Sequence, residues 1–281
     1  MLKPQRLQPG HFSKVRLKDN IRSIPGLDGW RYCHFDSVGS TNTIASELAH
    51  DGDPGQVWIT AGEQTAGKAR RGRGWVSKPG NLYASLLLID PAPAEQLGTL
   101  PLVASLALHR AVCDVVAGGR PDIAAAITIK WPNDILFDGK KLSGILLEAA
   151  YDTHGRLIVV LGFGVNCNHF PDNPLYPATS LADRGFNVSA EELFFALSRR
   201  LATELTLWAQ GAGFHLCRSE WLERASGRGK KIIARLSDRN IEGYFETVDE
   251  SGLMILRQDD GTRCEISSAD IFFGDLAESK V

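Results

Sequence analysis

Apolar residues recur along this chain at two different spacings, one typical of strands and one typical of helices. Short strand-like apolar runs lie at 30–37, 56–60, 81–89, 127–131, 135–137, 141–150 and 157–165. Helical spacing is found at 41–50, at 98–116 and at least twice between 190 and 224. Because successive strands can pair as hairpins, the pattern predicts an α+β fold, with a mixed or antiparallel sheet backed by helices, rather than a doubly wound α/β fold. Ser40 precedes the first helix, and its side-chain oxygen is predicted to cap the first turn.

The pattern changes after Gly227 and Gly229. Strand-like runs follow at 231–236, 243–248, 253–257 and 263–267, separated by turn signals at 249–252 and 259–261. A stretch of this kind fits a small antiparallel barrel of SH3-like size. The first residues show no helical period. We therefore expect an N-terminal arm (1–29), a helix-backed sheet domain (30–226) and a C-terminal SH3-like β domain (227–281).

Composition is that of an ordinary globular protein, with 281 residues of which 43% are hydrophobic and 23% charged. No apolar run approaches the roughly 20 residues needed to cross a bilayer, and residues 1–10 lack the apolar core of a signal peptide. We therefore expect a cytoplasmic protein with no membrane-bound part. The formal net charge of -2 gives no whole-protein case for nucleic-acid binding. The five scattered cysteines, without a Cys-x-x-Cys pair, argue against a disulfide framework or structural zinc.

A loop rich in glycine and arginine joins the second and third predicted strands. Residues 64–75 read Gln-Thr-Ala-Gly-Lys-Ala-Arg-Arg-Gly-Arg-Gly-Trp, and no acidic residue occurs between Glu63 and Asp90. Glycines let backbone N–H groups approach a ligand, and arginine forks bind phosphate or carboxylate, so the loop predicts an anion site. On the loop alone, a solvated basic segment or a nucleic-acid contact stays open. The chain contains no Walker A sequence, so a nucleotide would bind by another architecture.

Three further segments carry candidate chemistry. Residues 130–134 read Lys-Trp-Pro-Asn-Asp, 141–148 read Lys-Leu-Ser-Gly-Ile-Leu-Leu-Glu, and 162–166 read Gly-Phe-Gly-Val-Asn. Lys141 begins an apolar strand, so its ammonium must be paired or reach a polar cavity, unless it only lines the exposed mouth of a turn. Asn133 and Asp134 could be turn formers. The paired glycines lack the third glycine of a dinucleotide fingerprint and could mark a bulge at a strand end.

Taken together and in this order, these segments resemble the biotin–protein ligase family over about residues 30–275. The resemblance implies a class II synthetase-like sheet domain with catalytic activity and an SH3-like C-terminal domain. It implies an enzyme that forms biotinyl-5′-AMP from biotin and ATP, with Mg²⁺ carried by the ATP. The enzyme then transfers biotin to a lysine of a biotin carboxyl carrier domain of a carboxylase. Residues 1–29 leave no room for a helix-turn-helix domain, so the chain resembles the monofunctional class, and we expect no DNA binding. Monomer and homodimer both stay open.

Site roles follow from the resemblance, position by position. It implies a biotin pocket formed by Ser40, Thr41, Asn42, Gln64, Gly67, Lys68, Ala69, Arg70, Lys141 and Gly144. It implies adenylate contacts from Arg70, Arg71, Arg73, Trp75, Asn133 and Asn166, of which Trp75 and Asn166 would stack on and hydrogen-bond the adenine. The implied catalytic groups are Lys141, Arg70 and Asp134. Lys141 would contact the biotin carboxylate and the α-phosphate, Arg70 would add to the electrostatic stabilisation, and Asp134 would position these cations or a metal ion. No dedicated metal site is identified.

The loop of residues 67–75, called the arginine loop below, departs from the usual family pattern Gly-Arg-Gly-Arg-Arg-Gly-Arg. Lys68 replaces the first arginine and loses its fork, while Ala69 replaces a glycine at a position that could need positive φ. Retention of the adenylate is therefore less assured than its formation. We expect this loop to be mobile without ligand and to order over the adenylate. The alternatives are a lipoate ligase or octanoyltransferase of the same superfamily and a non-catalytic sensor, although the intact Lys141 and Arg70 speak against a sensor.

Overall fold

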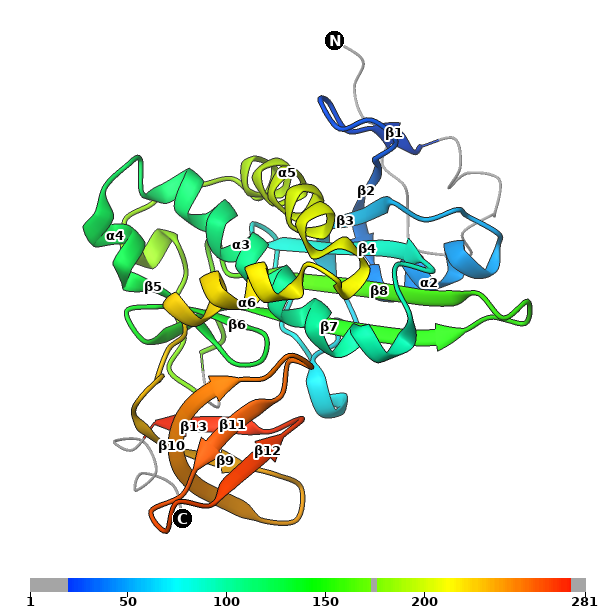
Figure 1. Ribbon diagram of the computed structural model, residues 1–281. Helices are drawn as coiled ribbons and strands as arrows, with labels where there is room; N and C mark the ends of the chain where they lie inside the picture. Colours follow the sequence, from blue (N-terminus) through cyan, green and yellow to red (C-terminus); the bar gives the residue numbers. More distant parts are fainter. Residues whose placement is uncertain (1–19, 173–175, 274–281) are drawn as a thin grey trace.

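The computed structural model describes residues 20–172 and 176–273, and a large mixed sheet forms its centre (Figure 1). Its eight strands are β1 (Arg22–Ser23), β2 (Arg31–Val38), β3 (Val57–Gln64), β4 (Leu82–Ile89), β5 (Ile127–Lys130), β6 (Asp134–Phe137), β7 (Lys140–Tyr151) and β8 (Leu157–Val165). They lie in the order β1-β2-β3-β4-β8-β7-β6-β5. Only β2 and β3 pair in parallel, and the other neighbours are antiparallel. The predicted α+β class is thus confirmed.

Helices cover both faces of this sheet because side chains alternate between the faces along each strand. In β3, Val57 and Ile59 pack under α2 (Thr41–His50), whereas Trp58 between them belongs to the main core on the other face. That core holds α3 (Leu100–Val116), α5 (Ala190–Trp208) and α6 (Phe214–Glu223). A short helix that the sequence pattern did not indicate, α4 (Pro121–Ala126), precedes β5.

The central helix is more apolar than the sequence pattern indicated. By length and composition Ala94–Val116 would be long enough to cross a membrane, and 72% of its most apolar window is buried inside the protein. Most residues of α3 are buried, and α3 contacts both α5 and α6. This segment is the core helix of the fold.

Two local expectations change at the start of the chain. Residues 20–29 are not only an arm, because β1 within them pairs with β2 at the sheet edge. Ser40 occupies the N-cap position of α2, but its side chain forms no capping hydrogen bond, so this prediction is wrong. The Ser40 side chain instead lines a cavity, next to the backbone N–H of Thr41, which donates to the Gln64 side chain at 2.9 Å.

The C-terminal part is a five-stranded antiparallel sheet in the order β12-β11-β10-β9-β13, drawn orange to red in Figure 1. Its strands are β9 (Lys231–Arg235), β10 (Asn240–Val248), β11 (Met254–Arg257), β12 (Arg263–Ile266) and β13 (Asp270–Phe273). The small β domain is confirmed, with one strand more than predicted. That strand, β13, pairs with β9 and brings Asp270 opposite Arg235. The domain limits themselves stay predictions, and the predicted ends 1–19 and 274–281 lie outside the described residues.

Candidate active site

A cavity of about 330 Å³ lies where the first turn of α2, the arginine loop, β7 and β8 meet the C-terminal β domain. Of the residues predicted to form the site, all except Gly67 and Arg71 line it. Residues that sequence reasoning did not assign also line it, among them Lys130, Tyr176 and Asp270. The predicted residues, spread over much of the chain, are therefore neighbours in space.

One end of the cavity is neutral and polar. Thr41 donates to Gln64 Oε1 through its backbone N–H at 2.9 Å and its hydroxyl at 3.1 Å, so the Gln64 amide has a fixed orientation. Asn42 Nδ2 donates to Glu148 at 2.7 Å, and the Ser85 hydroxyl donates to Asn42 Oδ1 at 2.5 Å. The result is a row of neutral amide and hydroxyl groups whose donors and acceptors are set before a ligand enters.

Ser85 and Glu148 do not line the cavity but hold Asn42, and the sequence analysis assigned neither, although Glu148 lies in the 141–148 motif. Ser85 is a fully buried hydroxyl in the otherwise apolar strand β4, and buried polar groups need partners. Glu148 belongs to the 141–148 motif, and it binds both Asn42 and, at 3.4 Å, Lys68. Lys68 therefore forms an ion pair beside the neutral end, at the cavity rim.

Glycines make room for the side chains that cross the strands. A Cβ on Gly162 would lie 2.2 Å from Asn42 Oδ1, and one on Gly164 would lie 2.6 Å from the Trp75 ring. Gly144 is less tight, with its nearest contact to Trp75 at 3.2 Å. The bulge interpretation of the paired glycines is wrong, because β8 pairs in continuous register with β4 and with β7.

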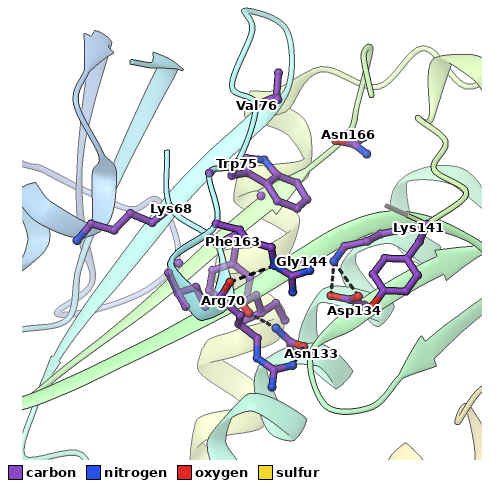
Figure 2. A pocket seen from close by; sticks show the side chains of 18 of the residues that line it. Lys68, Arg70, Trp75, Val76, Asn133, Asp134, Lys141, Gly144, Phe163 and Asn166 are labelled. Atoms are coloured by element: carbon purple, nitrogen blue, oxygen red, sulfur yellow. Dashed lines mark hydrogen bonds and ion pairs between the residues drawn. The ribbon is translucent and has the colours of Figure 1, made fainter. Parts of the chain in front are cut away.

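The other end of the cavity is cationic. Lys141 Nζ lies 2.7 Å from both carboxylate oxygens of Asp134, so Lys141 is not the exposed mouth of a turn, and Asp134 is more than a turn former (Figure 2). Arg70 donates to Asn133 Oδ1 at 3.1 Å and to Ser268 Oγ at 2.7 Å. Burial lowers the pKa of Arg70 from its usual value, opposed by the nearby carboxylates of Asp134 and Asp270. The end is rich in positive charge and only partly neutralised.

The arginine loop is folded back on itself as a small hairpin. Lys68 pairs with Gly74 as an antiparallel bridge. Gly67 lets the two arms of the hairpin approach closely, since a Cβ there would lie 2.5 Å from the Trp75 carbonyl oxygen. Ala69 has an extended backbone with φ -131, so the concern that alanine hinders this position is not borne out. Positive φ angles occur instead at the next positions of the loop, Arg71 (φ 57) and Gly72 (φ 69).

Two arginines of this loop bind the C-terminal β domain. Arg71 Nη1 lies 2.9 Å from Asp270 Oδ2, and Arg73 Nη2 lies 3.2 Å from Asp270 Oδ1. Arg71 also donates to the Arg235 carbonyl at 3.4 Å. The left-handed backbone at Arg71 turns its side chain out of the cavity, so the structure does not bring Arg71 to the predicted adenylate position, whereas Arg73 lines the cavity.

Trp75 and Asn166 lie toward the same wall. The Trp75 indole nitrogen is buried and has no hydrogen-bond partner within residues 20–172 and 176–273, and its ring lies 5.7 Å from Lys141 Nζ. Asn166 uses its amide nitrogen on the Thr179 carbonyl at 3.1 Å. A planar apolar surface beside an amide suits an aromatic heterocycle. Among the described residues, no group of three or more His, Cys, Asp or Glu could hold a metal ion.

Comparison with known proteins agrees with this geometry. Residues 34–166 match the Biotin/lipoate A/B protein ligase family, and 228–274 match the Biotin protein ligase C terminal domain. The chain is 38% identical over 244 residues to a biotin–[acetyl-CoA-carboxylase] ligase of Paracoccus denitrificans, covering 84% of this chain and 97% of that protein. A biotin protein ligase of Aquifex aeolicus in complex with biotin and ATP has a TM-score of 0.70 at 26% identity, over 86% of this chain and 97% of that one. The Leishmania major enzyme in complex with biotinyl-5-AMP has a TM-score of 0.59 at 26% identity, over 84% and 98%.

The fold and the cavity thus define a protein of the biotin/lipoate ligase class. Within that class, the C-terminal domain match and the extent of identity show that the chain belongs to the biotin–protein ligase family.

Proposed function

We propose that this chain condenses biotin with ATP to biotinyl-5′-AMP and pyrophosphate, and then transfers the biotinyl group to a lysine of a carboxylase carrier domain. In the first step a biotin carboxylate oxygen attacks the α-phosphorus and pyrophosphate leaves. In the second step the carrier amine attacks the biotinyl carbonyl, AMP leaves, and the amine loses a proton.

The observation that carries the proposal is the joining of two unlike ends in one cavity. The preset amides of Asn42 and Gln64 and the Thr41 hydroxyl suit a neutral cyclic urea, which needs fixed neutral donors and acceptors. The Lys141 ammonium suits the site where two anions must approach each other. Asp134 holds that ammonium in place, and so the lysine is positioned before substrate arrives.

Support from Arg70 and Trp75 completes the assignment. The arginine loop brings the Arg70 guanidinium to the cationic end, where its fork suits the phosphate of the adenylate. Trp75 offers a ring face for the adenine. When bound, Mg²⁺ would offset charge on the triphosphate. The cavity carboxylates, Asp134 and Asp270, are both paired with cations, which fits an ion held mainly by phosphates and water rather than a resident protein metal.

Pyrophosphate release tests the proposal most simply. The chain with ATP and biotin should release pyrophosphate and form an acyl-AMP detectable by mass spectrometry, whereas lipoate or octanoate in place of biotin should give little. Acyl-AMP formed with lipoate alone would favour the lipoate class, and no acyl-AMP from any of these acids would favour a non-catalytic sensor.

We also propose that the chain acts in the cytoplasm, in line with the sequence expectation, and that it does not read DNA sequence. A gel-shift experiment at physiological salt, with and without biotin, tests the second point. Salt-resistant binding to one promoter sequence would contradict it.

A further inference from the structure

Lys130 is a buried cation at the cavity for which neither the resemblance nor the proposed mechanism gives a task. It is the last residue of β5, it lies opposite Asp134 in the strand register, and only 8% of its surface is exposed. Within the described part of the chain, its ammonium has no hydrogen bond and no ion pair. Its contacts are aromatic, with Nζ 4.2 Å from the Tyr176 ring centroid and 5.7 Å from that of Phe273.

A buried ammonium without an anionic partner is unfavourable, and aromatic faces compensate for only part of the lost hydration. The unfavourable burial also appears in the pKa of Lys130, which burial lowers to about 8. The charge of Lys141 adds to this decrease, and the carboxylates of Asp134 and Asp270 oppose it. A methionine would fill the same apolar space without this cost. The charge is therefore unexplained by packing and points to an anion that enters the cavity.

The position of Lys130 says which anion this is. Lys141 faces Trp75 and Gly144, the wall proposed for the adenine and the reacting carboxylate. Lys130 instead lies under Tyr176 and Phe273, on the side where β13 of the C-terminal domain closes the cavity. Carboxylate and α-phosphate already have Lys141 and Arg70. No side chain has so far been assigned to the two outer phosphates of ATP, whose charge a single Mg²⁺ only partly offsets.

We propose that Lys130 binds the β- and γ-phosphates of ATP and stabilises the departing pyrophosphate. The inference rests on the proposed function, and it adds a catalytic residue for the adenylation step alone. Pyrophosphate has left before the carrier lysine attacks, so Lys130 should have no part in the second step.

The experiment uses the full chain and four proteins: wild type, Lys130→Met, Lys130→Arg and the control Lys140→Met. Lys140 is exposed at the start of β7, so its replacement removes the same charge without touching the cavity. Inorganic pyrophosphate binding is measured by calorimetry, adenylation by acyl-AMP formation, and transfer with chemically made biotinyl-5′-AMP and a carrier domain.

For Lys130→Met we expect pyrophosphate affinity to fall by about tenfold or more and adenylation to fall by a factor on the order of 10². Biotin affinity and transfer from ready-made biotinyl-5′-AMP should stay within about twofold of wild type. Lys130→Arg should keep most of the pyrophosphate affinity, and Lys140→Met should behave as wild type. The melting temperature of Lys130→Met should equal or exceed that of wild type, because a buried charge has been removed.

Three results would overturn the inference: unchanged pyrophosphate binding in Lys130→Met, an equal loss in Lys140→Met, or an equal loss in the transfer step. A lower melting temperature with parallel loss of biotin binding would assign Lys130 a structural role and would overturn it too. If wild type forms no biotinyl-AMP while Lys130→Met still loses pyrophosphate affinity, the proposed function fails and the anion site stands. If wild type forms biotinyl-AMP and Lys130→Met does so equally well, the function stands and the assignment of Lys130 fails.

Discussion

Replacing Asp270 by asparagine should loosen the arginine loop from the C-terminal domain while leaving both sheets folded. Asp270 is the shared partner of Arg71 and Arg73, and Asn at this position keeps the shape of the side chain but removes its charge. The remaining loop contacts, from Arg70 to Asn133 and Ser268, stay in place. The variant therefore removes both ion pairs between the loop and the β domain at once.

The size of the effect follows from exposure. The side chains of Arg71 and Arg73 are 35% and 42% exposed, against 17% for Asp270, so both pairs are well screened by water. Pairs of this kind contribute between 0 and about 1 kcal/mol each. Two pairs that share one carboxylate should stabilise the closed loop by about 1 kcal/mol in total, which corresponds to an opening about five times more frequent in the variant.

Limited trypsin digestion measures this opening directly, because the loop contains its own cleavage sites at Lys68, Arg70, Arg71 and Arg73. When opening and closing are fast, the cleavage rate follows the open population. We expect the Asp270→Asn loop to be cut about five times faster than wild type at low salt, and the two rates to converge at high salt as the pairs are screened. ATP with biotin should slow cleavage in both proteins if the loop orders over the adenylate, which stays a prediction.

Asp259→Asn is the matched control, since Asp259 binds Lys231 at 2.8 Å in the same β domain, away from the loop. It should be cut at the wild-type rate. The account of the loop contacts is refuted if Asp270→Asn is also cut at the wild-type rate at low salt. It is equally refuted if Asp270→Asn melts much earlier and is cut throughout, since the carboxylate would then support the fold rather than the loop.

Other variants test other parts of the molecule. Lys141→Ala should keep biotin affinity within about twofold but reduce adenylate formation by a factor on the order of 10², as single-turnover acyl-AMP measurements would show, and a near wild-type rate would remove Lys141 from the reacting carboxylate. In Gly164→Ala the new methyl group must displace the Trp75 ring, so the KM for ATP should rise by about tenfold while calorimetry shows unchanged biotin binding; an unchanged KM would mean that Trp75 does not hold the adenine. His109 is buried, and its Nε2 is hydrogen-bonded to the Ile127 carbonyl oxygen at 2.9 Å. Burial lowers the pKa of His109 from 6.5 to about 4, so this side chain takes up a proton more readily in the unfolded state than in the folded state. The His109 contribution should therefore lower the free energy of unfolding as pH falls from 6.5 to 4, by at most about 1.4 kcal/mol per pH unit. In urea unfolding over this pH range, the free energy of unfolding of His109→Gln should fall less steeply with pH than that of wild type. Identical slopes in the two proteins would contradict this prediction.

Local periodicity predicted most of the strands because the burial of each sheet face selects apolar residues along the strand itself. The strand at 157–165 was predicted with its observed bounds, since it is apolar on both faces and ends at Asn166. By contrast β13 reads only Asp-Ile-Phe-Phe and gains its identity from pairing with β9, a contact between residues more than thirty positions apart. The Ser40 cap also failed for a non-local reason, since the Ser40 side chain lines a cavity built from distant parts of the chain.

The site was predicted as a set of residues but not as a set of partners. The family resemblance implied that Asp134 positions Lys141 and Arg70 or a metal ion, and the structure joins Asp134 directly to Lys141. Spacing could not show that Arg71 turns away to Asp270, because that depends on a left-handed backbone and a distant strand. Nor could it show that Lys130 lies under aromatic rings, since Tyr176 and Phe273 come from segments with no motif.

Intact-mass spectrometry of a carrier domain is the most direct test of the central claim. Incubated with the chain, biotin and ATP, a biotin carboxyl carrier domain should gain one biotinyl group. A carrier in which the acceptor lysine is replaced by arginine should gain none, and omission of ATP should abolish the reaction. A carrier that stays unmodified with biotin, or that gains a lipoyl group as readily, would contradict the account.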